Sequence, residues 1–221
     1  MTSFGRLTAV AAPMDLPDVD TDRIVPARFL RKPKSPEYAR ALFHDVRFNP
    51  DGSEKPDFVL NQPPYRDARI LVCGENFGCG SSREMAVWAL DAYGIRVVIA
   101  PSLGDIFRQN CYTNGLLPVI LPADVMAGLR QQLCDRPGAT ITVDLEAQTV
   151  EAPDGRHHRF EIDPFRKQML LTGQDAIALT LGYESRIAEY EAGRRSRMPW
   201  LPTLASQVSR RPGTGAPAPP P

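Results

Sequence analysis

The fold of this chain is decided by the stretch Ala68-Arg69-Ile70-Leu71-Val72-Cys73, Gly74-Glu75-Asn76-Phe77-Gly78-Cys79-Gly80, Ser81-Ser82-Arg83-Glu84-Met85-Ala86-Val87-Trp88-Ala89-Leu90 and, after Gly94, Ile95-Arg96-Val97-Val98-Ile99-Ala100. The first piece is a short apolar run, typical of a buried strand. The third carries apolar residues at helical spacing and stops before a glycine. The fourth is β-branched and ends at a proline, which predicts a second strand. The order predicts a βαβ unit with parallel strands, in which small ligands bind where the first strand ends and the helix begins.

The glycine loop at this junction has the chemistry of an anion site. Its three glycines let the backbone approach a ligand closely or adopt left-handed angles. Free N–H groups and the positive end of the helix dipole favour an anion, and Arg83 adds a planar cation suited to a carboxylate or a phosphate. The loop is neither a Walker A motif nor the dinucleotide fingerprint, because its glycines stand at Gly74, Gly78 and Gly80 without a following lysine.

Ser81 has a second interpretation that is purely structural. The spacing of Ser81 and Glu84 matches a capping box, with the serine as N-cap and the glutamate at the third helical position. Local sequence alone favours this interpretation for Ser81. It leaves the glycines, Ser82 and Arg83 unexplained, and a hydroxyl at a helix start beside an arginine can be both a cap and acidified.

The composition is that of an ordinary globular chain of 221 residues. Its 26 basic and 26 acidic residues balance, so no global field attracts nucleic acid or an anionic membrane. No apolar run approaches the ~20 residues of a membrane helix, and residues 1–10 lack a signal pattern. We therefore expect no nucleic-acid partner, no membrane and a cytoplasmic location. The four cysteines lack C-x-x-C spacing and are expected to be reduced thiols that hold no metal: Cys73, Cys79, Cys111 and Cys134.

Two polar segments lie before the central unit. The first carries four carboxylates that could hold a hard cation, although turn and cap roles fit their spacing better; they are Asp15, Asp18, Asp20 and Asp22. The second, residues 27–34, is basic, which suits either a dicarboxylate or a solvated loop.

The rest of the chain is predicted to form further helices and strands, which belong to one domain at residues 1–195. We expect strands at 4–12 and 116–121, antiparallel strands at 140–145, 148–152 and 158–162, and helices at 35–42, 103–110, 123–134, 164–171 and 184–191. The three histidines read as structural or surface residues. The proline-rich tail, 196–221, is expected to be disordered or partly polyproline II.

The segment Asn76-Phe77-Gly78-Cys79-Gly80-Ser81-Ser82-Arg83-Glu84 resembles the signature of the small subunit of 3-isopropylmalate dehydratase, a family similar to the swivelling domain of aconitase. Further segments match in the same order, from about residue 7 to residue 191, among them Val19-Asp20-Thr21-Asp22-Arg23 and Asn114-Gly115-Leu116-Leu117-Pro118. The resemblance implies an α/β fold of the aconitase-type swivelling β/β/α class, with a βαβ core and additional antiparallel strands.

The resemblance also implies a function. The family isomerises 2-isopropylmalate and 3-isopropylmalate by dehydration and rehydration in leucine biosynthesis, and the small subunit is active only with a large subunit. A 4Fe-4S cluster would be carried by that large subunit, with no metal bound by this chain. The family implies Ser81 and Arg83 as catalytic residues, and a small dicarboxylate held by Ser82, Asp22, Thr21 and Arg31.

This chain departs from the family pattern just after the signature. Met85 replaces the usual histidine and Val87 the usual proline. Replacement of the histidine removes a titratable side chain within one helical turn of the site. This change bears on which substrate is bound more than on which reaction is catalysed. Two alternatives therefore stay open: a small subunit acting on another 2-hydroxy dicarboxylate, homoaconitate-like or alkylmalate-like, and a non-catalytic anion-binding module.

Overall fold

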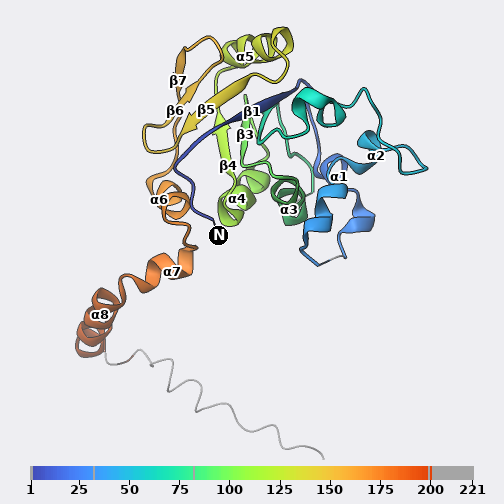
Figure 1. Ribbon diagram of the computed structural model, residues 1–221. Coiled ribbons are helices and arrows are strands. Elements are labelled where there is room, and N and C mark those ends of the chain that lie inside the picture. The colour runs from blue at the N-terminus through green and yellow to red at the C-terminus, as the bar shows by residue number, and fades with distance from the viewer. Residues whose placement is uncertain (1, 32, 82, 199, 201–221) are drawn as a thin grey trace, which may run out of the picture. The chain divides into compact units, whose positions relative to one another are not determined.

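The computed structural model describes residues 2–31, 33–81, 83–198 and 200 (Figure 1). The chain divides into two compact units, Met1–Ala176 and Ile177–Pro221. The first unit holds every strand assigned in the described residues, and it carries the predicted site.

One seven-stranded sheet organises the first unit, in the order β4-β3-β2-β1-β5-β6-β7. Its strands are β1 (Arg6–Met14), β2 (Ile70–Cys73), β3 (Val97–Ala100), β4 (Leu117–Ile120), β5 (Thr140–Asp144), β6 (Thr149–Glu151) and β7 (His157–Arg159). Strands β1 to β4 pair in parallel, with Ala11 beside Ile70 and Ile70 beside Val97. Strands β5 to β7 continue from β1 as an antiparallel meander. The parallel βαβ unit and the antiparallel strands are therefore both confirmed.

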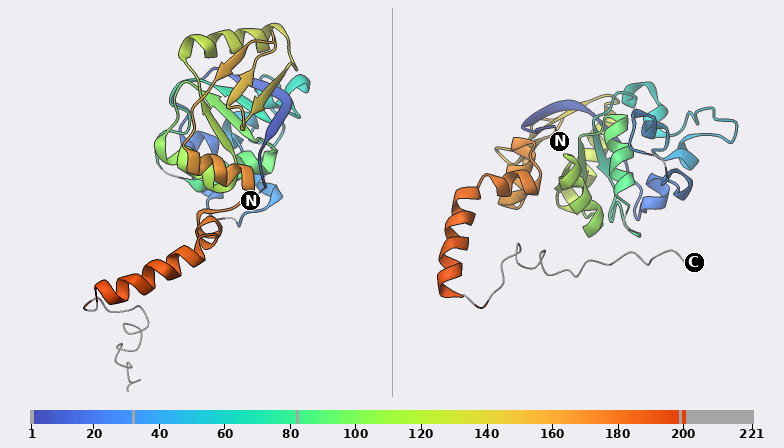
Figure 2. Two further views of the ribbon diagram at one scale, coloured as in Figure 1. Left: turned by 90° about the vertical axis from the view of Figure 1, so that its left-hand side faces the viewer. Right: turned by 90° about the horizontal axis from the view of Figure 1, so that it is seen from below.

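Helices cover both faces of the parallel strands. Helices α3 (Glu84–Tyr93) and α4 (Asp105–Asn114) lie on one face and α5 (Ala123–Asp135) on the other (Figure 1), and the left panel of Figure 2 shows the same layers from the side. The strands divide their side chains accordingly: Leu71 packs in the core under α3, while Ile70 packs in the core with α5. Because alternate strand residues face opposite ways, such doubly covered strands read as continuous apolar runs.

Several element boundaries differ from the prediction. The acidic loop contains a four-residue helix, α1 (Thr21–Ile24), and the predicted helix at 35–42 is the 3-10 helix Pro36–Arg40. Helix α4 runs to Asn114, where Gly115 ends it with a left-handed φ of 78°. The remaining helices are α2 (His44–Arg47), α6 (Pro164–Thr172), the unpredicted α7 (Ala176–Leu181) and α8 (Glu184–Arg197).

The predicted capping box is wrong. Helix α3 begins at Glu84, and the residue in the N-cap position is Arg83, with no side-chain cap hydrogen bond. The backbone of Arg83 is extended, with φ −135° and ψ 107°. Ser81 therefore lies before the helix, and Glu84 is its first residue instead of its third.

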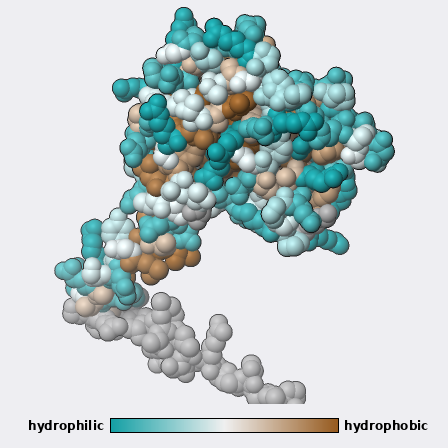
Figure 3. All heavy atoms as spheres, in the orientation of Figure 1, coloured by the Kyte–Doolittle hydropathy of each residue, from teal (hydrophilic) through white to brown (hydrophobic). Residues whose placement is uncertain are grey.

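The second unit contains α8 and most of α7. Ile177 and Leu181 expose 72% and 63% of their surface, and Figure 3 shows hydrophobic surface in the region of α7. Helix α8 passes residue 195, so the division into a domain at 1–195 and a tail at 196–221 stays a prediction. Residues 201–221 of that tail lie outside the described residues. No helix in the described part of the chain is long and apolar enough to cross a membrane.

Candidate functional site

The loop of residues 74–83 leaves the carboxyl end of β2 and enters α3. Strands β1, β2 and β3 are adjacent and parallel, so the segments that follow them gather at one edge of the sheet. These segments are residues 15–25 after β1, the loop itself and residues 101–104 after β3. The prediction from the sequence, that a ligand binds where β2 ends and α3 begins, rests on the same geometry.

Backbone hydrogen bonds fix the loop on both sides. Toward the segment after β1, the Gly78 N–H donates to the Val19 carbonyl at 2.7 Å, and the Thr21 N–H donates to the Cys79 carbonyl at 3.0 Å. Toward the segment after β3, the Gly104 N–H donates to the Phe77 carbonyl at 3.0 Å. The loop is thus a strand-like ribbon clamped between two neighbours.

The glycines of the loop allow close packing inside the protein. A Cβ on Gly74 would lie 2.4 Å from the Leu16 carbonyl oxygen, and one on Gly78 would lie 2.3 Å from the Phe107 ring. Gly78 also has a left-handed φ of 77°. Gly80, by contrast, is exposed, so only this glycine leaves backbone open at the surface. The sequence predicts that these glycines let the backbone approach a ligand closely. At Gly74 and Gly78, the backbone instead lies close to other parts of the same chain.

Arg83 is held by Asp22 through two parallel hydrogen bonds. Its Nη1 and Nη2 both donate to the Asp22 carboxylate, the second at 2.7 Å, and Nη1 also lies 3.4 Å from the Val25 carbonyl. The Arg83 side chain is 15% exposed and that of Asp22 is 54% exposed. Such a planar two-point contact fixes the orientation of a guanidinium. Among the described residues no group accepts a hydrogen bond from the Nε–H, so Nε is the nitrogen of this guanidinium that has no acceptor there.

Thr21 connects the same short helix to Ser81. Its buried hydroxyl donates to the Ser81 carbonyl oxygen, while Ser81 itself is exposed. Asp20 caps this helix by accepting a hydrogen bond from the Arg23 N–H at 2.7 Å. The structure therefore brings four of the predicted site residues together: Thr21, Asp22, Ser81 and Arg83.

The other two predicted site residues have different outcomes. Ser82 lies outside the described residues. Arg31 is exposed in the turn after the 3-10 helix Ala27–Phe29, and no hydrogen bond or ion pair joins it to the loop in the described part of the chain. Nearby, Lys34 Nζ lies 3.4 Å from Asn114 Oδ1, and Asn114 Nδ2 donates to Glu84 Oε1 at 2.9 Å. These residues tie the basic segment to the start of α3.

The four aspartates of the acidic segment each have a protein partner. Asp18 accepts from Asn76 Nδ2 at 2.7 Å, and Asp15 lies 2.9 Å from Arg130 Nε. The cap interpretation is confirmed for Asp20 alone, whereas Asp15 and Asp22 pair with arginines, a role that the sequence did not indicate. Across the residues that the structure covers, no group of three or more His, Cys, Asp or Glu is arranged for a metal ion.

The cysteines do not form a ligand set. Cys73 and Cys111 are buried on separate elements, Cys134 is exposed, and all four are free. Burial, with the nearby Asp18 and Asp20, raises the pKa of the Cys79 thiol. A raised pKa keeps the thiol protonated and makes Cys79 a poor nucleophile.

Comparison with known proteins gives consistent matches along the chain. The Aconitase C-terminal domain family matches residues 1–124, a domain described as LeuD_N matches residues 128–164, and the C-terminal domain of the 3-isopropylmalate dehydratase small subunit matches residues 177–203. The 3-isopropylmalate dehydratase small subunit of Rhodospirillum centenum is 52% identical over 90% of this chain and 98% of its own length. That of Parvibaculum lavamentivorans is 50% identical over 91% of this chain and all of its own.

A solved structure shares the fold. The crystal structure of a 3-isopropylmalate dehydratase from Methanocaldococcus jannaschii aligns with a TM-score of 0.61 and 26% sequence identity. The alignment covers 83% of this chain and 99% of that one. The expected α/β class is confirmed by this likeness and by the aconitase-type match.

Proposed function

This chain belongs to the family of 3-isopropylmalate dehydratase small subunits, and we propose that its loop of residues 74–83 supplies the base and the carboxylate-binding cation of the family reaction. As a member it is a component of a hydro-lyase that works with a large subunit in leucine biosynthesis. One observation carries the proposal: Ser81 and Arg83 lie on one clamped loop, each held by a residue of the same short helix.

The reaction moves a hydroxyl between adjacent carbons of 2-isopropylmalate. A proton leaves one carbon, hydroxide leaves its neighbour, and both are returned in the opposite arrangement. We assign the proton transfer to Ser81: its alkoxide accepts the proton from carbon and, as a hydroxyl, returns it in the rehydration step. Its exposure at the sheet edge leaves its Oγ accessible to a substrate.

An alkoxide at Ser81 requires strong stabilisation, because each unit of pKa depression needs about 1.4 kcal/mol. The N–H groups at the start of α3 and its dipole are one source. The charge of Arg83 is a weaker source than the sequence suggested, since Asp22 neutralises much of it. We therefore propose that part of the stabilisation of the Ser81 alkoxide arises only in the closed complex with the large subunit, where water is excluded.

Arg83 binds a substrate carboxylate through its remaining edge. With Asp22 occupying the Nη1 and Nη2 side, the Nε and Nη2 side is oriented for a second two-point contact. Thr21 positions the Ser81 backbone, and Ser82 and Arg31 are assigned to the second carboxylate of the substrate. For this role, the segment that carries Arg31 has to move toward the loop of residues 74–83, because the structure leaves Arg31 exposed and without a contact to that loop.

The iron–sulfur centre of the reaction is assigned to the large subunit. The described cysteines of this chain do not fit a cluster, since two are buried on different elements and the others lie apart. Bound in the partner, a 4Fe-4S cluster would supply a Lewis acid for the leaving hydroxyl. A small dicarboxylate would lie between the two subunits.

We propose a cytoplasmic location for this chain, because its proposed role is a step of amino-acid biosynthesis.

The substrate proposed is isopropylmalate, in line with the names of the relatives. Met85 is half-buried and packs against the core under α3, and Val87 is fully buried. Both departures from the family pattern are thus accommodated by packing. Nothing in the comparisons favours a homoaconitate-like substrate or a non-catalytic module.

The test is dehydration of 3-isopropylmalate by the chain purified anaerobically with its large subunit, followed by absorbance of the new double bond. Ser81→Ala should lower kcat on the order of 10²-fold to 10⁴-fold, the usual contribution of a positioned base. Ser3→Ala, also exposed, is the matched control and should retain full activity. Arg83→Lys should raise KM and lower kcat, since lysine cannot make the planar contact.

The result that contradicts the proposal is specific. Turnover of the Ser81→Ala complex within a factor of about three of Ser3→Ala would remove Ser81 from the reaction, since removing a true base costs far more. Thermal unfolding of both variants should coincide, because Ser81 is not the cap of α3. A purified complex with an intact partner and no activity on isopropylmalate would redirect the substrate to another 2-hydroxy dicarboxylate.

A further inference from the structure

A pocket lies at the other end of α3 from Arg83. It is a pocket of about 290 Å³ lined by Ala39, Arg40, Arg47, Phe48, Gly52, Glu54 and Tyr93. Tyr93 is the last residue of α3, whereas Arg83 precedes its first residue. A ten-residue helix is about 15 Å long, so the pocket is separate from the loop of residues 74–83.

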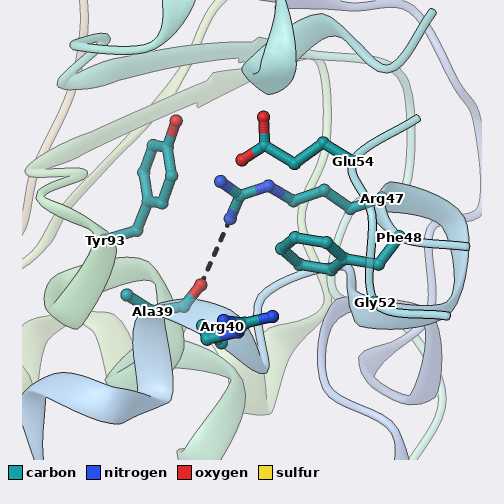
Figure 4. Close-up of a pocket in the computed structure, with 7 residues that line it drawn as sticks. All are labelled: Ala39, Arg40, Arg47, Phe48, Gly52, Glu54 and Tyr93. Atoms are coloured by element: carbon teal, nitrogen blue, oxygen red, sulfur yellow. Dashed lines mark hydrogen bonds between the residues drawn. The ribbon is translucent and has the colours of Figure 1, made fainter. Parts of the chain in front are cut away.

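Arg47 forms the floor of this pocket. It is only 7% exposed, and its guanidinium lies between the rings of Phe48 and Tyr93, at 5.0 Å and 4.7 Å from their centroids (Figure 4). Its Nε donates to Asn61 Oδ1 at 2.8 Å and its Nη1 to the Ala39 carbonyl at 3.2 Å. Burial lowers the pKa of this guanidinium.

The positive charge of Arg47 has no carboxylate partner in direct contact. No described carboxylate lies within 4.0 Å of its nitrogens, and its Nη2 has no hydrogen-bond partner among the described residues. Glu54 points into the pocket but is bound by Arg66 Nη2 at 2.5 Å. Arg40 adds a further guanidinium at the rim, over the other side of Phe48. The carboxylate of Glu54 therefore faces three guanidiniums, those of Arg40, Arg47 and Arg66, and the cluster keeps an excess of positive charge.

We propose that this pocket binds a small organic monocarboxylate. The carboxylate would accept hydrogen bonds from Arg47 Nη2 and from Arg40. Its apolar body would lie against the rings of Phe48 and Tyr93, as in most small-molecule sites, where a few polar groups orient a ligand held by apolar walls.

The pocket favours a monoanion over phosphate or a dicarboxylate. Glu54 occupies the wall opposite Ala39 and Arg40 (Figure 4), and it would repel a second negative charge on the ligand. The Tyr93 hydroxyl is already used, because its single proton is shared between the carbonyl oxygens of Leu60 and Arg66, which lie 3.1 Å and 2.9 Å from the hydroxyl oxygen. Its ring therefore contributes a wall and no further donor. This selectivity distinguishes the pocket from the dicarboxylate site proposed at Arg83.

The test is a titration of the full chain followed by two-dimensional amide NMR, with isovalerate as the probe. We expect saturable shifts at Phe48, Gly52 and Tyr93. Isovaleramide, its uncharged isostere, should bind at least tenfold more weakly, and inorganic phosphate should not compete. Arg40→Gln, at an exposed position, should weaken binding about threefold to fivefold, the range of a solvent-exposed ion pair. Arg83→Gln should leave the pocket shifts unchanged.

Three results would overturn the proposal. One is the absence of saturable shifts, and another is equal binding of isovalerate and isovaleramide. The third is pocket shifts that appear only when the large subunit is added, which would assign Arg47 to an acidic side chain of that protein. Arg47→Gln is a second variant, but the Arg40→Gln and isostere comparisons decide the matter if it fails to fold. Because the readout needs no turnover, failure here leaves the dehydratase assignment untouched.

Discussion

At the residue scale, the Asp22–Arg83 pair shows what can be read from the chain and what cannot. The sequence marks Arg83 as an anion-binding cation, and the family resemblance brings Asp22 to the site. Neither indicates that the two side chains bind each other, because they are separated by 61 positions and meet only through the sheet topology. The link between Lys34, Asn114 and Glu84 is missed for the same reason, since it joins three elements.

We predict that Asp22→Asn loosens Arg83 without unfolding the protein. The amide can accept only one of the two charged hydrogen bonds, so kcat/KM of the assembled enzyme should fall on the order of 10-fold to 100-fold, as for a misplaced binding group. The free energy of unfolding should change by no more than about 1 kcal/mol, because the carboxylate is more than half exposed. Steady-state kinetics and urea unfolding measure the two effects.

Glu54→Gln is the matched control for that prediction. It removes a carboxylate that also binds an arginine in two-point fashion, but away from the loop of residues 74–83. Activity should stay at the wild-type level in this variant. If Asp22→Asn and Glu54→Gln behaved alike in kinetics, the Arg83 pair would have no part in catalysis.

At the scale of elements, the sequence predicts those whose signals are local. Strands β2 and β3, helix α3 and its end at Gly94 follow from periodicity and one glycine, which has φ 108°. The start of α3 could not be predicted, because the chain before it is kept extended by hydrogen bonds from the segment after β1. Helix α8 extends beyond its predicted end at residue 191 and reaches Arg197, because the next proline in the sequence is Pro199.

Gly78→Ala and Gly128→Ala should have opposite effects on stability. Gly78 has a left-handed φ, and a methyl group there would overlap the Phe107 ring, so we expect a cost of about 2–5 kcal/mol. Gly128 lies inside α5 with open space around it, so alanine should stabilise by about 0.5–1 kcal/mol. Chemical unfolding of the two single variants gives both values. A stable Gly78→Ala protein would mean that the loop of residues 74–83 is not clamped as described.

At the scale of the whole molecule, strand existence was predictable but strand order was not. The sequence indicates a parallel unit and an antiparallel meander, and both are present. What it could not indicate is that β1 joins them, pairing in parallel with β2 and antiparallel with β5. That pairing depends on long-range closure, and no local pattern carries it. The division into compact units at Ile177 likewise has no local sequence pattern, and a separate family match begins at the same residue.

We predict that a chain ending at Trp200 keeps the stability and the activity of the full protein. Residues 201–221 are rich in proline and poor in large apolar side chains, so their removal should change the free energy of unfolding by less than about 0.5 kcal/mol. Thermal unfolding and the dehydration assay check this. In the full chain, trypsin should cut first after Arg210, since Pro212 blocks cleavage after Arg211. A lower melting temperature after truncation would show that the tail packs on the protein.

The central place of β1 has a consequence for synthesis on the ribosome. Strand β1 is translated first, yet its two neighbours begin only at Ile70 and Thr140. Until the second of these emerges, one side of β1 presents unpaired backbone groups to solvent, the kind of open edge that recruits other strands. A nascent chain that stalls before Asp144 therefore has an unfinished sheet with its middle strand exposed, and it is prone to pair with strands of other chains.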